Sequence, residues 1–227
     1  MSSRLLPGLC LACALSMPAF AAGPRTITMN GHGEIKAVPD IAIVNAGVTT
    51  SAQTAAAALS ANSTRMNQVF DALKKLGIPD RNIQTANFSI SPQFTMGESS
   101  NSHRVTGYQV NNEVSVRLTD VKRAGTVLDT LAGAGANQMN GISFDIATPA
   151  PLLEKARTQA VSDAHARAET FARAAGVTLG PIISISEGAS EPQARPLYRV
   201  MALAAPAPVA PGEQSVTADV TVVWEIH

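Results

Sequence analysis

The 227-residue chain has 45% apolar and 15% charged residues, and its 17 basic residues balance its 17 acidic ones. Neutrality argues against a nucleic-acid partner, because binding to phosphates requires clustered Lys and Arg. It gives equally little support for attraction to an anionic membrane surface. The length is sufficient for one large domain or two small ones with a substantial buried core.

The first 21 residues have the pattern of a cleaved secretory signal peptide. Arg4 supplies a positive charge, residues 5–14 are apolar, and residues 19–21 place alanine at the two positions that a signal peptidase recognises. The apolar run is shorter than the roughly 20 residues that span a bilayer. No other segment approaches that length, so we expect no transmembrane helix in the mature chain. Residues 22–227 are then a single domain.

Both cysteines, Cys10 and Cys13, lie inside the predicted signal. The residues before them do not fit a lipoprotein signal. We therefore expect a mature chain without thiols or disulfides, whose stability in an oxidising compartment comes from its core. Because Arg4 is removed as well, the mature chain carries one net negative charge.

Seven segments alternate between apolar and polar residues with the period of a strand that is buried on one face. They are Thr26–Lys36, Ile41–Thr50, Ile83–Phe94, Val105–Leu118, Ile142–Ala147, Pro181–Glu187 and Ser215–Ile226. The last is the clearest, since Val216, Val220 and Trp224 fall on one side and Thr217 and Thr221 on the other. Such patterns are typical of an antiparallel or mixed sheet with one covered face.

Three segments have helical patterns and supply the cover. In residues 55–76 an apolar stripe is broken only by Asn62, and Gly77 is placed to end the helix before Pro79. The stripe also fits a coiled coil, but a helix that lies on a sheet needs the same spacing. A second, short helix is predicted over Val121–Leu131, with Asp120 as its N-cap.

The third helix, Pro151–Ala175, has alanine at every third or fourth position, which permits close approach to a sheet or another helix. Asp163–Arg167 and Glu169–Arg173 are predicted i,i+4 ion pairs on its outer side, and Gly176 ends it. The predicted fold class is therefore α+β: a mixed, mostly antiparallel sheet of about seven strands covered by three helices.

Two further segments are predicted to be loops. Residues 96–104 are polar and rich in serine, and residues 188–213 contain five prolines in an Ala-Pro alternation that favours extended, mobile chain. Loops of more than about 15 residues are uncommon inside compact domains. The second segment is thus either disordered or used for contact with a partner.

No catalytic, cofactor-binding or metal-binding residue is predicted. His103 and His227 are expected to be exposed, and His165 with Glu169 would offer a metal only two ligands on one helix face. The sequence contains no Gly-x-Ser-x-Gly, His-Glu-x-x-His or Walker motif. A Ser–His–Asp triad assembled from distant residues is not marked by any pattern.

His32 lies in the glycine-rich sequence of residues 30–34, but no helix follows it, as phosphate binding would require. Gly31 and Gly33 instead indicate a β-bulge or a close backbone approach. Trp224 is expected to anchor the core or an interface, and Arg117 and Asp120 are expected to lie in solvent at a strand end.

The order of several motifs resembles that of the SIMPL-domain family, which includes bacterial periplasmic immunogenic proteins. The motifs are Gly31–Val48, Leu76–Thr85, Gly107–Val116, Gly135–Asn137 with Gly141–Phe144, Ala156–Glu169 and Gly176–Gly180 with Ile185–Glu187. The resemblance runs from about Thr26 to Ile226. It implies a secreted α+β envelope protein. It also implies that some members form large homo-oligomeric rings or channel-like particles and that others are associated with resistance to oxidative stress. The family has no established catalytic residues to carry over.

The sequence therefore favours a non-enzymatic periplasmic or cell-envelope protein without cofactors. We expect it to be homo-oligomeric, to serve envelope maintenance or oxidative-stress protection, and to associate peripherally with the envelope or outer membrane. The alternative is a periplasmic module that binds a small ligand under residues 188–213. A hydrolase with unmarked geometry is the least favoured hypothesis.

Overall fold

The structure, a computed structural model, describes residues 23–96, 103–188 and 209–227. They form seven strands: β1 (Thr26–Ala37), β2 (Ile41–Ala52), β3 (Ile83–Met96), β4 (His103–Leu118), β5 (Gln138–Asp145), β6 (Leu179–Glu187) and β7 (Gln214–Ile226). The α-helices are α1 (Ala55–Lys75), α2 (Ala124–Gly133) and α3 (Ala150–Ala175), and short 3-10 turns cover Asp80–Asn82 and Val121–Arg123. The α+β class predicted from the sequence is confirmed.

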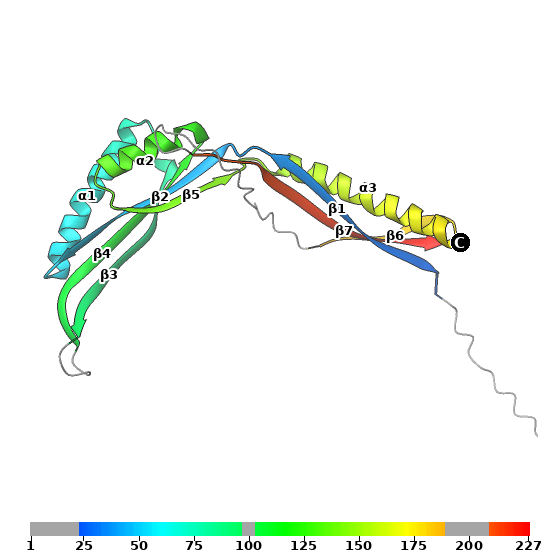
Figure 1. The fold of residues 1–227 in the computed structure, drawn as a ribbon, viewed down its shortest axis with the longest axis horizontal. Helices are drawn as coiled ribbons and strands as arrows, with labels where there is room; N and C mark the ends of the chain where they lie inside the picture. Colours follow the sequence, from blue (N-terminus) through cyan, green and yellow to red (C-terminus); the bar gives the residue numbers. More distant parts are fainter. Residues whose placement is uncertain (1–22, 97–102, 189–208) are drawn as a thin grey trace, which may run out of the picture.

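The strands are divided between two sheets, and every pairing is antiparallel. One sheet has the order β3-β4-β2-β5 and the other has the order β1-β7-β6. Figure 1 shows an arched molecule in which α1 and α2 lie on the outer side of the first sheet and α3 on the outer side of the second. The helix-free faces of both sheets line the inner side of the bend.

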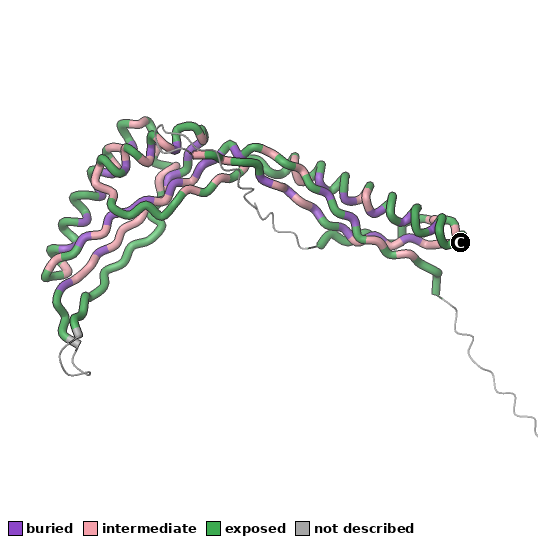
Figure 2. Tube along the Cα trace, in the orientation of Figure 1, coloured by how far each residue is buried: buried purple, intermediate pink, exposed green. Residues whose placement is uncertain are grey.

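The two halves have separate cores. In the first, buried valines and alanines of β2 and β4 pack against α1 and α2; in the second, β7 packs against α3. Figure 2 shows buried positions along β2, β4 and β7 and along one side of each α-helix, whereas β3 and β6 are mostly exposed. Trp224 is 2% exposed and anchors the second core, as the sequence predicts. The one-sided burial follows from the two-residue period of the strands.

Helix α1 buries most of its predicted stripe, including the polar residue that breaks it. Asn62 is fully buried, and its Nδ2 donates to the carbonyl oxygens of Val48 at 2.7 Å and Val110 at 3.4 Å. Its Oδ1 has no hydrogen-bond partner in the described structure. Leu59, which the stripe predicts to be buried, is 37% exposed. The buried side of the helix therefore contains one amide, which is held by backbone carbonyls of β2 and β4.

Helix α3 lies unusually close to β1. A Cβ atom on Gly31 would lie 1.9 Å from the carbonyl oxygen of Ala160, and one on Gly33 would lie 1.9 Å from that of Ala156. The pairing of β1 with β7 continues through both glycines without a register shift. The glycines thus serve close backbone approach and not a bulge, and the alanine face of α3 meets them.

Side chains of α3 also protect the outer edge of β1. The backbone N–H of His32 donates to Asp163 Oδ2 at 3.0 Å, and that of Glu34 donates to Gln159 Oε1 at 3.3 Å. Asp163 also pairs with Arg167 at 3.0 Å, as predicted. The predicted Glu169–Arg173 pair is not formed; Glu169 Oε1 lies 3.8 Å from His165 Nδ1 instead.

The junction between the halves is held by hydrogen bonds. The Asp40 N–H donates to the Asp145 carbonyl at 3.2 Å, and Asp40 Oδ1 accepts from the Ala147 N–H at 2.7 Å. The Gln214 side chain donates to the Phe144 carbonyl oxygen. These contacts connect the β1–β2 linker to β5 and to the β5–α3 linker, and they connect the start of β7 to β5.

Candidate functional site

The four histidines do not form a catalytic group in the part of the chain that the structure describes. His32 Nδ1 lies 2.8 Å from Asp219 Oδ1 on the helix-free face of the β1-β7-β6 sheet, and both side chains are more than half exposed. Neighbouring hydroxyls are used elsewhere, since Ser215 donates to Glu34 and Thr221 donates to Asn30. A His–Asp pair is therefore present without a bonded hydroxyl nucleophile.

The other histidines lie elsewhere in the fold. The ring of His165 meets Trp224 edge-on, with 6.2 Å between the ring centroids. His227 is exposed at the end of β7, and His103 begins β4. Among the described residues, no three His, Cys, Asp or Glu side chains are grouped to hold a metal ion. No helix among them is long and apolar enough to cross a membrane.

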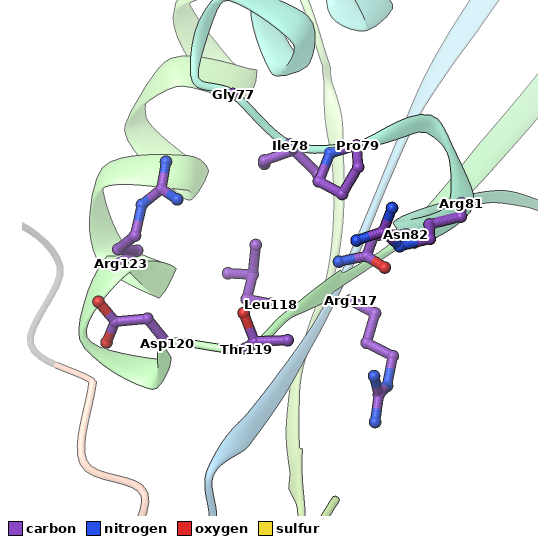
Figure 3. A pocket seen from close by; sticks show the side chains of 10 residues that line it. All are labelled: Gly77, Ile78, Pro79, Arg81, Asn82, Arg117, Leu118, Thr119, Asp120 and Arg123. Atoms are coloured by element: carbon purple, nitrogen blue, oxygen red, sulfur yellow. The ribbon is translucent and has the colours of Figure 1, made fainter.

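Three arginines line a hollow of about 250 Å³ between the end of α1 and the end of β4. Arg123 donates to the Leu76 carbonyl at 2.6 Å and so satisfies the C-terminus of α1. Figure 3 shows that the side chain of Arg117 extends away from Arg123 and that Arg81 lies on the far side of Asn82. The guanidinium groups do not converge on one point, so the hollow lacks the geometry of a preformed anion site.

Figure 3 also places Asp120 at the start of the turn before α2. Its carboxylate accepts from the Lys122 N–H at 3.0 Å, which confirms the predicted capping role, although the capped element is the 3-10 turn that precedes the helix. Arg117 and Asp120 are both exposed, as predicted.

Strand β3 is the most unusual surface element of the described chain. It forms the outer edge of its sheet, contains no charged residue over its 14 positions, and pairs only with β4. Phe88, Ile90 and Phe94 lie on the same face of this edge strand and are 41–57% exposed. Edge strands are ordinarily protected by charges, prolines, bulges or a covering element. Strand β3 has Pro92 and two register shifts, but it has no charge, and none of the described helices or strands covers its outer edge.

The other outer edges are better protected. The edge of β1 is covered by Asp163 and Gln159, and β5 carries Asp145. Strand β6 exposes Ile182, Ile183 and Ile185, but it ends in Glu187, which pairs with Arg157 at 2.7 Å. The strand with the exposed isoleucines thus also carries a charge, which β3 lacks.

The helix-free face of the β3-β4-β2-β5 sheet has a region of uncharged polar side chains. A hollow of about 300 Å³ on this face is lined by Thr49, Ser89, Ser91, Gln109, Asn111 and Gln138. Alternation along Val105–Leu118 predicts that Gln109 and Asn111 share a face. Gln109 and Asn111 lie beside Ser91 and Ser89 because of the β3–β4 register, which the sequence pattern does not predict.

The predicted loop at residues 188–213 lies mostly outside the described residues. Its described end, Val209, packs against the first core. A hollow of about 400 Å³ at the junction of the halves is lined by residues that include Arg117, Asp145 and Gln214. A ligand site under residues 188–213 stays a prediction. Most of the predicted loop at residues 96–104 also lies outside the described residues.

Comparison with known proteins identifies relatives over nearly the whole chain. Residues 27–224 match the family model SIMPL, described as "Protein of unknown function (DUF541)". The chain is 38% identical over 232 residues to the "26 kDa periplasmic immunogenic protein" of Brucella melitensis, covering 95% of this chain and 93% of that protein. It is 32% identical over 194 residues to "Uncharacterized protein YggE" of Edwardsiella ictaluri, covering 86% and 80%. YggE of Escherichia coli K12 is 29% identical over 179 residues, covering 79% and 72%.

Proposed function

The chain belongs to the SIMPL family, and on that premise we propose that it is a periplasmic protein that acts as an assembly of identical copies and not as an enzyme. Its role is in envelope maintenance or protection from oxidative stress, at the outer membrane or elsewhere in the envelope. The relative from Brucella melitensis has a periplasmic name, and the first 21 residues have the pattern of a secretory signal.

The observation that carries the assembly is the uncharged, apolar edge of β3. Two antiparallel copies of one strand are related by a two-fold axis perpendicular to the sheet, so a residue pairs with one on the same face. In a register centred on Ser91, Ile90 meets Pro92 of the second copy and Phe88 meets Phe94. Apolar side chains then cover each other, and serine and glutamine side chains meet on the opposite face.

This arrangement would join two four-stranded sheets into one of eight strands and would bury the exposed aromatic side chains. Pro92 removes one backbone donor from the edge, which limits the length of the new ladder but leaves its apolar contacts intact. Burial of apolar area contributes about 25 cal/mol per Å², so two phenylalanines and an isoleucine from each copy supply most of the favourable free energy.

The test is the molar mass of the protein purified from cells that express the full chain. Light scattering coupled to size exclusion is expected to give a multiple of the chain mass at micromolar concentration. Ile90→Lys places like charges close together across the two-fold axis and should reduce that mass. Phe171→Lys, which changes a 57% exposed residue on α3, is the matched control and should leave it unchanged.

A wild-type protein that is strictly monomeric would overturn the assembly. An unchanged mass for Ile90→Lys, with a reduced mass for Ile185→Lys, would move the interface from β3 to β6. The biological role has a separate test: cells that lack the gene should survive peroxide less well, and only assembling variants should restore survival. A catalytic role would gain support if Ile90→Lys, folded and monomeric, restored survival fully.

A further inference from the structure

We infer that the helix-free face of the β3-β4-β2-β5 sheet is a binding face for a neutral glycan, centred on the hollow of about 300 Å³ beside Asn111. The six side chains around this hollow are three hydroxyls, those of Thr49, Ser89 and Ser91, and three amides, those of Gln109, Asn111 and Gln138. None is charged. This inference goes beyond the assembly proposed above and does not depend on it.

The pairing register shows why these side chains gather. Asn111 lies directly between Thr49 of β2 and Ser89 of β3, and Gln109 lies between Ser51 and Ser91. Side chains of directly paired residues point to the same face, and α1 covers the opposite one. Four adjacent strands therefore present rows of hydroxyl and amide groups to the inner side of the arch (Figure 1).

Hydrogen bonds within the face hold part of it in place. Thr49 Oγ1 donates to Asn111 Oδ1 at 2.8 Å, and Asn137 bonds the backbone N–H and carbonyl of Thr49 at 2.7 and 2.8 Å. Gln93 Nε2 donates to both Gln109 Oε1 and Ser51 Oγ at 3.3 Å. The face is thus preorganised, which lowers the entropy that a ligand must lose on binding.

Several side chains of this face have donors or acceptors that remain available to a ligand. Within the described residues, the side chains of Ser89, Ser91 and Gln138 make no hydrogen bond, and the amide N–H groups of Asn111 and Gln109 have no acceptor. Hydroxyls and amides both donate and accept, which matches the hydroxyl groups of a sugar. A neutral polyol can use both functions at once.

Other classes of ligand fit this face less well. Nucleic acid and other polyanions need Lys or Arg, and none lines the hollow. An extended peptide is recognised through free backbone groups at an edge. At the hollow, β4 is paired with β2 and β3, and the Asn137 side chain occupies the backbone N–H and carbonyl of Thr49. Lipid chains need an apolar lining. The nearest carboxylate on the face is Glu113, which pairs in register with Gly47 at the border of the hollow.

Among the described residues, none on this face has an aromatic ring that could stack on a sugar. Each sugar unit should therefore bind weakly through side-chain hydrogen bonds. Long glycans would then bind better than short ones, because several sugar units can contact the rows of side chains on one face at the same time. A polymeric envelope glycan and a soluble oligosaccharide share this chemistry. The experiment separates the two sources.

The experiment uses protein purified from cells expressing the full chain. Saturation-transfer NMR with maltohexaose and with N-acetylchitotetraose tests soluble glycans, and co-sedimentation with isolated peptidoglycan sacculi tests the polymer. We expect binding to at least one of these probes. Binding confined to sacculi would assign the polymer as the source, and binding to the oligosaccharides would assign soluble sugar. A neutral decapeptide and heparin are the competing probes.

The double variant Gln109→Leu and Gln138→Leu removes two amides of the hollow with little change in size. Binding should weaken by about tenfold or more, because two hydrogen bonds to the ligand are lost. Gln84→Leu changes an exposed glutamine of the same face outside the hollow and should bind as the wild type does. Thermal unfolding checks that all three proteins are folded.

The inference is wrong if no glycan probe binds, if the decapeptide or heparin binds in place of the glycans, or if the double variant binds like the wild type. Its failure is distinguishable from that of the assembly. Ile90→Lys should lower the molar mass while retaining binding to each glycan probe that the wild type binds, and the double variant should keep the wild-type mass.

Discussion

The substitution Gly33→Ala tests the contact between α3 and β1 directly. The new methyl group would begin 1.9 Å from the Ala156 carbonyl oxygen and 2.8 Å from the Ala160 nitrogen, both of which belong to the helix backbone. An ordinary contact is roughly 3.4 Å or more, so helix and strand must separate locally by about 1.5 Å. Neither of the blocking atoms lies at the end of a flexible side chain.

The cost has two parts. Overpacking of a close contact costs about 1–3 kcal/mol. The same movement stretches the hydrogen bonds that Gln159 and Asp163 accept from the edge of β1, each of which contributes about 1 kcal/mol. The expected loss is therefore about 3–5 kcal/mol. For a chain of this size, 1 kcal/mol changes Tm by roughly 2–4 °C, so Tm should fall by about 6–20 °C.

Urea unfolding followed by tryptophan fluorescence measures the effect. The chain has a single tryptophan, Trp224, which is buried in the core that α3 covers. Gly133→Ala is the matched control, because a Cβ there would have nothing within 4 Å and the residue ends α2. It should be neutral or stabilise the protein by up to about 1 kcal/mol. Equal unfolding midpoints for Gly33→Ala and the wild type would refute the close approach.

Three further substitutions test other contacts. The pKa of Asp163 is lowered, first by the hydrogen bond from the His32 N–H and then by the one from Arg167. Its stabilisation is present above the unfolded value near 3.8 and is lost as pH falls through the lower folded pKa. As the pH is lowered from 4, the free energy of unfolding measured in urea should therefore fall more for the wild type than for Asp163→Asn. An equal fall in both proteins would contradict this. Asn62→Asp places a charge in the first core and should destabilise by at least about 3 kcal/mol at pH 7, whereas Asn62→Leu should cost much less; similar denaturation midpoints for the two variants would show that the site is hydrated. Arg123→Ala removes the donor to the Leu76 carbonyl and should cost about 1 kcal/mol by urea unfolding, with exposed Arg81→Ala as a neutral control.

The helices and strands are largely predictable from sequence because their periods record which face is buried. The predicted helix Pro151–Ala175 agrees closely with α3, and Gly176 ends it in the left-handed conformation with a φ of 72°. The division into two sheets is not predictable in the same way. Alternation shows that Thr26–Lys36 and Ser215–Ile226 are half-buried strands, but it does not show that they pair with each other.

The same limit applies to side chains that meet across the sheets. His32 and Asp219 are 187 positions apart, and their contact follows from the β1–β7 register. Asn62 shows a different limit, because a polar residue that breaks an apolar stripe does not reveal which hydrogen-bond partners would allow its burial. Here the partners are the carbonyl groups of β2 and β4, which local sequence patterns do not reveal.

The separation of strands between the sheets also sets an order of events during synthesis. Strands β2 to β5 and both of their helices lie in one continuous stretch, Ile41–Asp145, so this half has all its strands once that stretch has emerged. The other half cannot close until β7 arrives, because β7 is the central strand between β1 and β6. Until then β1, with its glycines, has no neighbour to pair with. The first strand to be made is thus among the last to be folded, and a newly made chain must be shielded from premature pairing at its N-terminal end.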